Sequence, residues 1–133
     1  MTSPKEPTVQ DIARAWLTLF EKCVRGRQYA QAKLLFHEQV VWFGIESNVT
    51  ATVIQAIEQE FKKLWPEQVA FSLDFGNAAI IPSGAMIFIA LPWTAQGKII
   101  GAPARIGRLT VVLAVFEDRK AKAVHGHCSV NPV

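Results

Sequence analysis

The chain has 133 residues, of which half are hydrophobic and 19% are charged, and its formal net charge is +3. This length suits one domain with a full hydrophobic core. The basic residues are scattered and form no stripe interleaved with aromatic residues, which argues against nucleic-acid binding. The large apolar fraction indicates an apolar interface shared between subunits, so we expect a homodimer.

The start of the chain and its most apolar stretch are informative about the cellular location of the protein. The first seven residues have no apolar signal core, and the most apolar stretch, residues 78–93, is broken by a Pro-Ser-Gly sequence. We therefore expect a cytoplasmic protein with no membrane partner, a disordered tail over residues 1–7 and a single domain over residues 8–133. Cys23 and Cys128 lie in apolar surroundings, as reduced core thiols do.

The first part of the chain has helical periodicity. Thr8 is placed to cap a helix, Asp11 lies in its first turn, and Gly26 ends it. The apolar residues between them recur at helical spacing and form one stripe. A shorter helix is expected over residues 29–37, followed by a short strand over residues 40–43.

A third helix is expected to begin at the Thr-Val-Ile-Gln sequence of residues 52–55, which has the spacing of a capping box, and to stop at Pro66. After it the period changes from 3.6 to 2. The expected strands cover residues 69–75, 78–81, 85–93, 106–116 and 121–129. This order predicts an α+β cone, with three N-terminal helices packed on a curved, mainly antiparallel sheet and a cavity between the first helix and its concave face.

The last two expected strands flank a short charged turn and carry polar side chains in an apolar setting. A hairpin that closes symmetrically pairs Phe116 with Ala121, Val112 with His125, Thr110 with His127, and Arg108 with Ser129. Directly opposed residues share a face of a sheet. One surface of the hairpin is therefore expected to gather a hairpin cluster, which consists of Arg108, Thr110, His125, His127 and Ser129.

Three motifs carry a resemblance to a known family. They are Val41-Trp42-Phe43-Gly44 after the helical pair, Gly107-Arg108-Leu109-Thr110 in the penultimate strand, and Val124-His125-Gly126-His127-Cys128-Ser129 with Pro132 after it. With the element order over about residues 8–132, they resemble the nuclear-transport-factor-2-like (cystatin-like cone) superfamily, and within it the SnoaL-like and ketosteroid-isomerase-like branch. The last motif also resembles the end of the association domain of calcium/calmodulin-dependent kinase II, a ring-forming member.

The resemblance implies the cone fold but no single activity, since the superfamily includes isomerases, polyketide cyclases, dehydratases, hydrolases, transport factors and assembly hubs. Ketosteroid isomerases carry a catalytic carboxylate just after the first strand, where this chain has Phe43 and no acid nearer than Glu46. Trp16 stands where their oxyanion-hole tyrosine is expected. Hydrolases of the limonene-epoxide type use an Asp-Arg-Asp set, of which this chain offers only Arg108 and Asp74.

The hairpin histidines are the first candidates for chemistry. A neutral imidazole at His125 or His127 is suited to act as general base or acid on a substrate in the cone. The alternative is a structural pair, bonded to backbone or to Ser129 or placed at a subunit interface. A His-x-His pair on a strand supplies two ligands, whereas zinc needs at least three, so we expect neither a metal nor another cofactor.

Arg108 is the second candidate, because a guanidinium in an apolar cone binds a carboxylate or enolate oxygen through two hydrogen bonds. Thr110 then adds a hydroxyl donor on the same wall. The alternative is a salt bridge from Arg108 to Asp74 or Glu46. If the polar face of the hairpin is the convex one, these residues become interface residues instead.

Three aromatic residues, Trp16, Phe20 and Trp42, are candidates to line a pocket for an aromatic ligand, with ordinary core packing as the alternative. The leading functional hypothesis is a SnoaL-like protein that holds a small apolar or aromatic ligand with an oxygen anion in its cone. Any catalysis there is expected to be cofactor-free proton transfer, as in isomerisation, cyclisation or dehydration. The second hypothesis is a non-catalytic oligomerising or ligand-binding module of the same superfamily.

Overall fold

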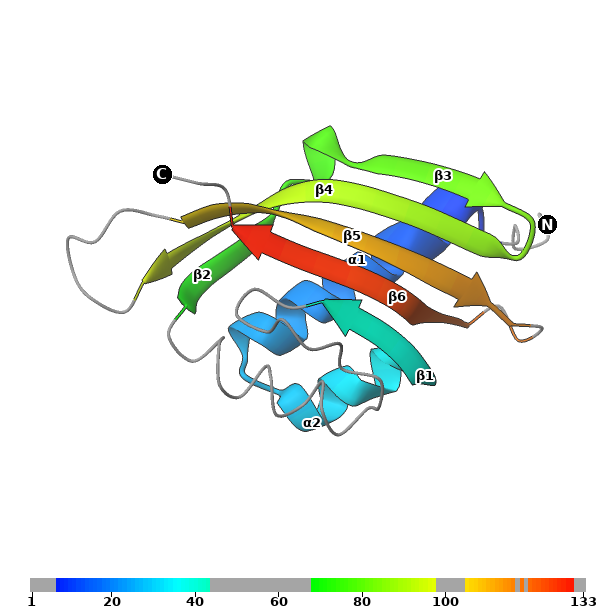
Figure 1. Ribbon diagram of the computed structural model, residues 1–133, viewed down its shortest axis with the longest axis horizontal. Helices are drawn as coiled ribbons and strands as arrows, with labels where there is room; N and C mark the ends of the chain where they lie inside the picture. The colour runs from blue at the N-terminus through cyan, green and yellow to red at the C-terminus, as the bar shows by residue number, and fades with distance from the viewer. Residues whose placement is uncertain (1–6, 44–67, 98–104, 117, 119, 131–133) are drawn as a thin grey trace, which may run out of the picture.

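The computed structural model describes residues 7–43, 68–97, 105–116, 118 and 120–130. Its centre is a six-stranded, curved sheet with strand order β1-β6-β5-β4-β2, in which β3 pairs with the other end of β4 (Figure 1). The strands are β1 (Phe36–Phe43), β2 (Gln68–Leu73), β3 (Ala79–Ser83), β4 (Met86–Gly97), β5 (Arg105–Val115) and β6 (Ala121–Val130). β1 and β6 are parallel and the other pairs are antiparallel, so the sheet is mixed but mainly antiparallel, as expected.

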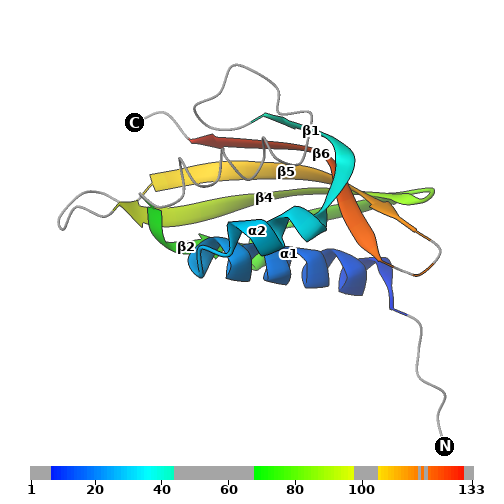
Figure 2. The same cartoon turned by 90° about the horizontal axis from the view of Figure 1, so that it is seen from below.

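Helix α1 (Val9–Arg25) and the short α2 (Tyr29–Ala32) lie on one side of the sheet (Figure 2). The expected α+β architecture and the long first helix are confirmed, whereas the third expected helix lies outside the described residues. The helix predicted over residues 29–37 ends earlier than expected. A 3-10 turn, η1 (Lys33–Leu35), follows α2 and leads directly into β1 at Phe36. Phe36 is fully buried, with its ring edge-on to Trp42 at 5.5 Å, so tertiary packing overrides the helical pattern.

Both ends of α1 have well-defined caps. At its start, the Thr8 side chain accepts a hydrogen bond from the Asp11 backbone, which confirms the expected N-cap. The Asp11 carboxylate also accepts a hydrogen bond from the Thr8 backbone, so the two residues form a capping box that the sequence analysis did not predict. These bonds hold the pKa of Asp11 below its ordinary value, so their stabilisation is present at neutral pH and is lost as the carboxylate protonates in acid. At its end, Gly26 is the C-cap, but Arg27 takes the left-handed conformation, with φ of 56°.

The β5–β6 hairpin has the expected register at the hairpin cluster but not at its turn. Val112 pairs with His125, Thr110 with His127 and Arg108 with Ser129, as a symmetric hairpin predicts. Near the turn, Val115 pairs with Ala121, so the expected pairing of Phe116 with Ala121 is wrong by one residue. A bulge that leaves Val124 without a partner on β5 absorbs the difference.

Two tryptophan–glycine pairs shape the inner face of the sheet, the face covered by α1. Trp42 on β1 is paired with Gly126 on β6, and Trp93 on β4 is paired with Gly107 on β5. A methyl group at Gly126 would overlap the indole of Trp42, and one at Gly107 would overlap the indole of Trp93 and the carbonyl of Ser129. Each tryptophan is therefore buried against the sheet because its cross-strand neighbour has no side chain.

Adding a methyl group at either pair should destabilise the fold. We expect Gly126→Ala to lower the free energy of unfolding by about 3 kcal/mol, because the core must shift around the Trp42 ring. Chemical denaturation measures this, and the loss should be smaller in a Trp42→Phe background. Gly76→Ala is the matched control, since its added methyl meets only Asp74 Oδ1, at 3.6 Å. Equal stability of the Gly126 and Gly76 variants would contradict the packing argument.

A substitution at Arg27, the residue with a left-handed backbone after α1, should stabilise the fold instead of destabilising it. Arg27→Gly should raise the free energy of unfolding by about 1 kcal/mol, because glycine adopts positive φ without the steric cost that a Cβ imposes. Arg27→Ala keeps the Cβ and should leave stability close to that of the wild type. Thermal or denaturant unfolding of the two variants side by side distinguishes backbone strain from loss of the arginine side chain, which would affect both equally.

Candidate functional site

The hairpin cluster lies on the outer face of the sheet, the face turned away from α1. Along β5 and β6 its members alternate with buried residues such as Leu109, Val111 and Cys128, which face the helix. Arg108 and His127 are exposed, whereas the other members are partly buried. The structure therefore brings the cluster together as expected, but on the convex side of the sheet.

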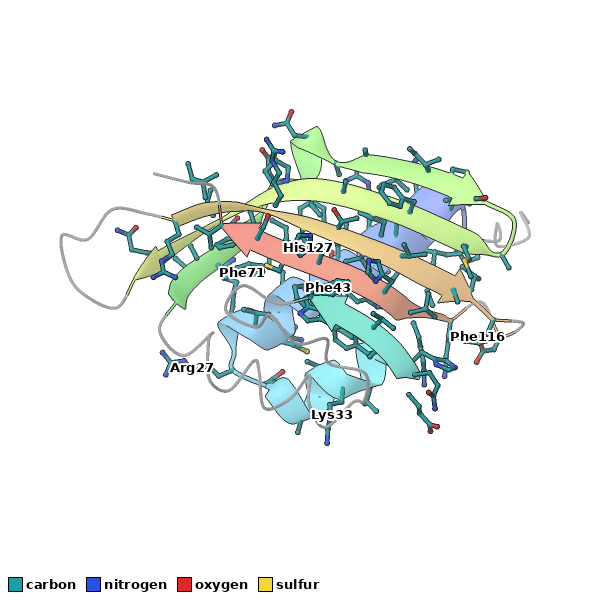
Figure 3. The ribbon with its side chains drawn as sticks, viewed as in Figure 1. Arg27, Lys33, Phe43, Phe71, Phe116 and His127 are labelled. Atoms are coloured by element: carbon teal, nitrogen blue, oxygen red, sulfur yellow. The ribbon has the colours of Figure 1, made fainter. Side chains whose placement is uncertain are left out.

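Phe43 joins this cluster from β1. Its ring meets the imidazole of His125 edge-on at 5.8 Å and that of His127 at 6.1 Å. Figure 3 shows Phe43 and His127 close together at one end of β1, with Phe116 at the other (Figure 3). An exposed phenyl ring between two histidines makes this part of the outer face more apolar than the histidines alone suggest.

Arg108 forms no ion pair with Asp74, one of the two carboxylates considered for it. The Asp74 carboxylate accepts a hydrogen bond of 2.7 Å from Asn77 Nδ2, and no ion pair joins Asp74 to Arg108. Glu46, the other acid considered, lies outside the described residues. Among the described residues, the one ion pair joins Glu21 to Arg25. The anion-binding role of Arg108 therefore stays a prediction. The structure places its guanidinium on the exposed outer face of the sheet and not in the cone.

Trp16, Phe20 and Trp42 are buried together between α1 and the sheet. Trp16 stacks on Phe20 at 5.2 Å, Phe20 lies 6.3 Å from Trp42, and all three are at most 3% exposed. Phe71 and Trp93 continue this aromatic layer across the sheet. In the structure these three side chains pack against one another. Their contact with a ligand remains a prediction.

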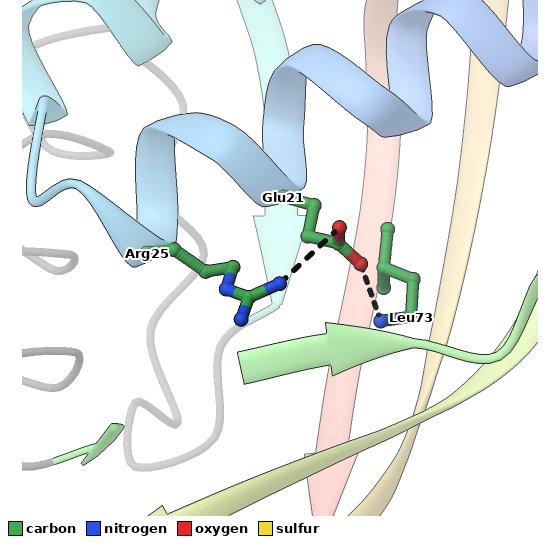
Figure 4. Close-up of polar contacts among 3 residues, drawn as sticks. All are labelled: Glu21, Arg25 and Leu73. Carbon is green, nitrogen blue, oxygen red and sulfur yellow. Dashed lines mark hydrogen bonds and ion pairs between the residues drawn. The ribbon is translucent and has the colours of Figure 1, made fainter. Parts of the chain in front are cut away.

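Glu21 is the acid that α1 directs at the sheet. Its Oε2 accepts a 2.8 Å hydrogen bond from the backbone N–H of Leu73, and its Oε1 lies 3.9 Å from Arg25 Nη1 (Figure 4). Both carboxylate oxygens thus have partners in the protein. This arrangement ties the last turns of α1 to the end of β2 and is structural in character.

Both cysteines belong to the core. Cys23 and Cys128 are buried and are not joined in a disulfide, in agreement with the sequence prediction of reduced core thiols. Burial raises the pKa of the Cys23 thiol, which keeps it protonated and poorly nucleophilic at neutral pH. Within the described residues, no group of three or more His, Cys, Asp or Glu is arranged to hold a metal ion.

The exposed large apolar side chains of the described residues fall into two groups. The first group lies on the outer face and consists of Phe43, Ile81, Met86, Phe88 and Ile106. The second group lines a groove of about 1080 Å³ between α1, η1, the start of β1 and the β5–β6 turn, and it consists of Leu19, Leu34 and Phe116. The described part of the chain therefore has two separate surfaces with exposed apolar side chains.

The sequence prediction missed the groove and its polar residues. His37 is the last residue of the helix expected over residues 29–37, but it lies on β1, where it lines the groove with Lys120 and Lys122. Phe36 and Val40 are four positions apart, which is helical spacing, so local periodicity does not mark the start of the strand at Phe36. Nothing in the sequence places the β5–β6 turn beside η1, because that contact depends on the parallel pairing of β1 with β6.

No family model and no curated protein matches the chain. Solved structures do match it. A cystatin-like-fold protein of unknown function from Nostoc punctiforme aligns with a TM-score of 0.76 and 13% identity over 96% of each chain. The chain has the NTF2-like, cystatin-like fold. A candidate calcium/calmodulin-dependent protein kinase II association domain from Xanthomonas campestris aligns at 0.77 and 14% identity, over 99% of this chain and 94% of that one.

A ketosteroid isomerase-like protein from Erwinia carotovora atroseptica shares the NTF2-like fold at a TM-score of 0.69 and 12% identity, over 94% of this chain and 95% of that one. Because the sequence identities are this low, these three comparisons show a shared fold and nothing finer. The resemblance inferred from the sequence is confirmed at the level of the fold. The described helices include none that is long and apolar enough to span a membrane.

The structural role of Glu21 can be tested directly. Glu21→Ala should lower the free energy of unfolding by about 2 kcal/mol, because it leaves the Leu73 N–H without its acceptor. Glu21→Gln keeps a side-chain oxygen and should cost clearly less. Denaturant unfolding of both variants measures the difference. A glutamine variant as unstable as the alanine variant would show that the charge, and not the hydrogen bond, matters.

Proposed function

We propose that this protein is a non-catalytic, self-associating module with the NTF2-like fold, and that a second copy of the chain covers its outer sheet face. The observation that carries the proposal is the apolar character of that face. Monomeric proteins rarely leave a continuous apolar patch of this kind in water. A homodimer buries the same patch on both copies at once, because a two-fold interface is self-complementary.

The apolar side chains are continuous across the strands. One cross-strand row on this face runs Ile81, Phe88, Val112, His125 and Val41. The next row runs Ala79, Ala90, Thr110, His127 and Phe43. Together the rows present aliphatic and aromatic groups around two imidazoles. Such a composition, with aromatic anchors and few charges at the centre, is typical of a protein–protein interface.

The charge of the outer face is also compatible with a second copy. Among the outer-face residues of the described strands that have a cross-strand partner there is no Asp or Glu. Arg108 is exposed and lies toward one end, next to Ser129 and Pro92, where a rim residue stays in contact with water. Self-association through these paired positions therefore buries no carboxylate and need not bury the guanidinium.

The same placement bears on the proton-transfer hypothesis. General acid–base catalysis by His125 or His127 needs a substrate held beside the ring in a space that excludes water. Both rings instead face outward beside Phe43, and the inner face is packed with aromatic side chains. The outward position favours the interface role for the hairpin cluster. The fold shared with a candidate association domain is in keeping with assembly.

A charge at the centre of the outer face should disrupt the assembly. We expect the wild type to be a dimer by light scattering coupled to gel filtration, and Phe88→Asp to weaken the dimer on the order of 100-fold, because a buried unpaired carboxylate costs about 3 kcal/mol. Leu34→Asp is the matched control, since Leu34 is more exposed and lies in the groove. It should stay dimeric.

Circular dichroism must show both variants folded, so that loss of the dimer is not loss of the fold. A wild type that is monomeric at every accessible concentration would overturn the proposal. An unaltered dimer in Phe88→Asp would move the interface away from the outer face. Catalytic function would be supported instead if His125→Ala and His127→Ala abolished a turnover shown by the wild type without changing its oligomeric state.

A further inference from the structure

The groove at the β5–β6 turn has the form of a small-molecule site. Its volume of about 1080 Å³ is at the upper end of the range of ligand pockets. Leu34 is 72% exposed, Leu19 49% and Phe116 42%, and all three line this one groove. These apolar groups come from three separate elements, so the groove is a product of the tertiary fold and not of one amphipathic helix.

Two contacts join the elements that form the groove. On its floor, Trp16 Nε1 donates a 2.8 Å hydrogen bond to the carbonyl of Leu35, which ties η1 to α1. On its wall, the imidazole of His37 stacks on the ring of Phe116, with centroids 6.2 Å apart and an interplanar angle of 14°. A preformed floor and a flat aromatic wall lower the entropic cost of binding a flat apolar group.

The imidazole of His37 is also oriented. Its Nδ1 accepts a 3.0 Å hydrogen bond from the backbone N–H of Gln39, so in the neutral ring the proton is carried by Nε2. The groove thus has a hydrogen-bond donor held by a backbone contact. The aromatic partner Phe116 keeps the ring in the plane of the wall.

The charges in the groove divide into those that are engaged and those that are available. Asp11 is held by Thr8 in the capping box, and Asp118 Oδ1 accepts a 3.0 Å hydrogen bond from the backbone N–H of Lys120. Glu38 is exposed at the edge of the groove. The ammonium groups of Lys120 and Lys122 form no ion pair within the described part of the chain. The two lysines are therefore the groups best placed to receive an anion.

We infer that this groove binds a small amphipathic carboxylate, with its flat apolar body between Leu34 and the His37–Phe116 pair and its carboxylate at Lys120 and Lys122. The match between an apolar wall, an oriented donor and two available ammonium groups carries the inference. The site uses no residue of the hairpin cluster. Lys122 is paired with Ala114, which is paired with Met86, so this lysine lies where the groove meets the edge of the outer face.

The test uses 2-naphthoate as the probe and 2-naphthamide as its uncharged counterpart, with calorimetric titration of the full chain. We expect saturable binding of the naphthoate, weakened at least ~10-fold in the double variant Lys120→Met, Lys122→Met, which keeps the apolar stems and removes both charges. The amide should bind wild type and variant equally weakly. Lys22→Met is the matched control, because Lys22 lies on α1 outside the groove, and it should bind like the wild type.

Amide chemical-shift mapping on the wild type gives a second readout that does not depend on any variant. Shifts should concentrate at Leu34, His37 and Lys122. No saturable binding of naphthoate, equal binding to wild type and double variant, or shifts centred on Phe43 and Phe88 would each overturn the inference. The Phe88→Asp variant should bind naphthoate like the wild type, so failure of the dimer and failure of this site are distinguishable.

Discussion

The structure depends on the two tryptophan–glycine pairs that face α1. Trp42 and Trp93 are too large to lie flat on a sheet unless the residue opposite each has no side chain, and Gly126 and Gly107 meet that requirement. The pairs determine which side of β5 and β6 faces the helix. Because side chains alternate along a strand, the residues on either side of each glycine must point outward.

That constraint explains why the hairpin cluster is on the convex face. Arg108 follows Gly107, and Gly126 lies between the two histidines. The described part of the inner face is filled by aromatic side chains, and the acid that α1 directs at it, Glu21, is held by the backbone of β2. Among the described residues, the features that our proposals assign to recognition are thus on surfaces, namely the apolar outer face and the groove at the β5–β6 turn.

The hairpin shows how a local irregularity can preserve the register of the hairpin cluster. With no extra residue, the pairing of Val115 with Ala121 at the turn would continue along the hairpin and place Arg108 out of line with Ser129. The bulge at Val124 shifts the pairing by one and restores the alignment of the cluster. It also bends β6, as bulges do, which helps the sheet curve around α1.

The sequence by itself determined the α+β order, the long capped helix, the strands of the sheet and the shared face of the hairpin cluster, because these follow from local periodicity and from residues close together in the chain. Tertiary structure decided which face of the hairpin meets the helix, through the pairing of Trp42 with Gly126 across distant strands. It also decided that Phe36 begins a strand and that His37 lies beside Phe116. Those outcomes depend on packing between segments far apart in the chain, which short-range patterns do not encode.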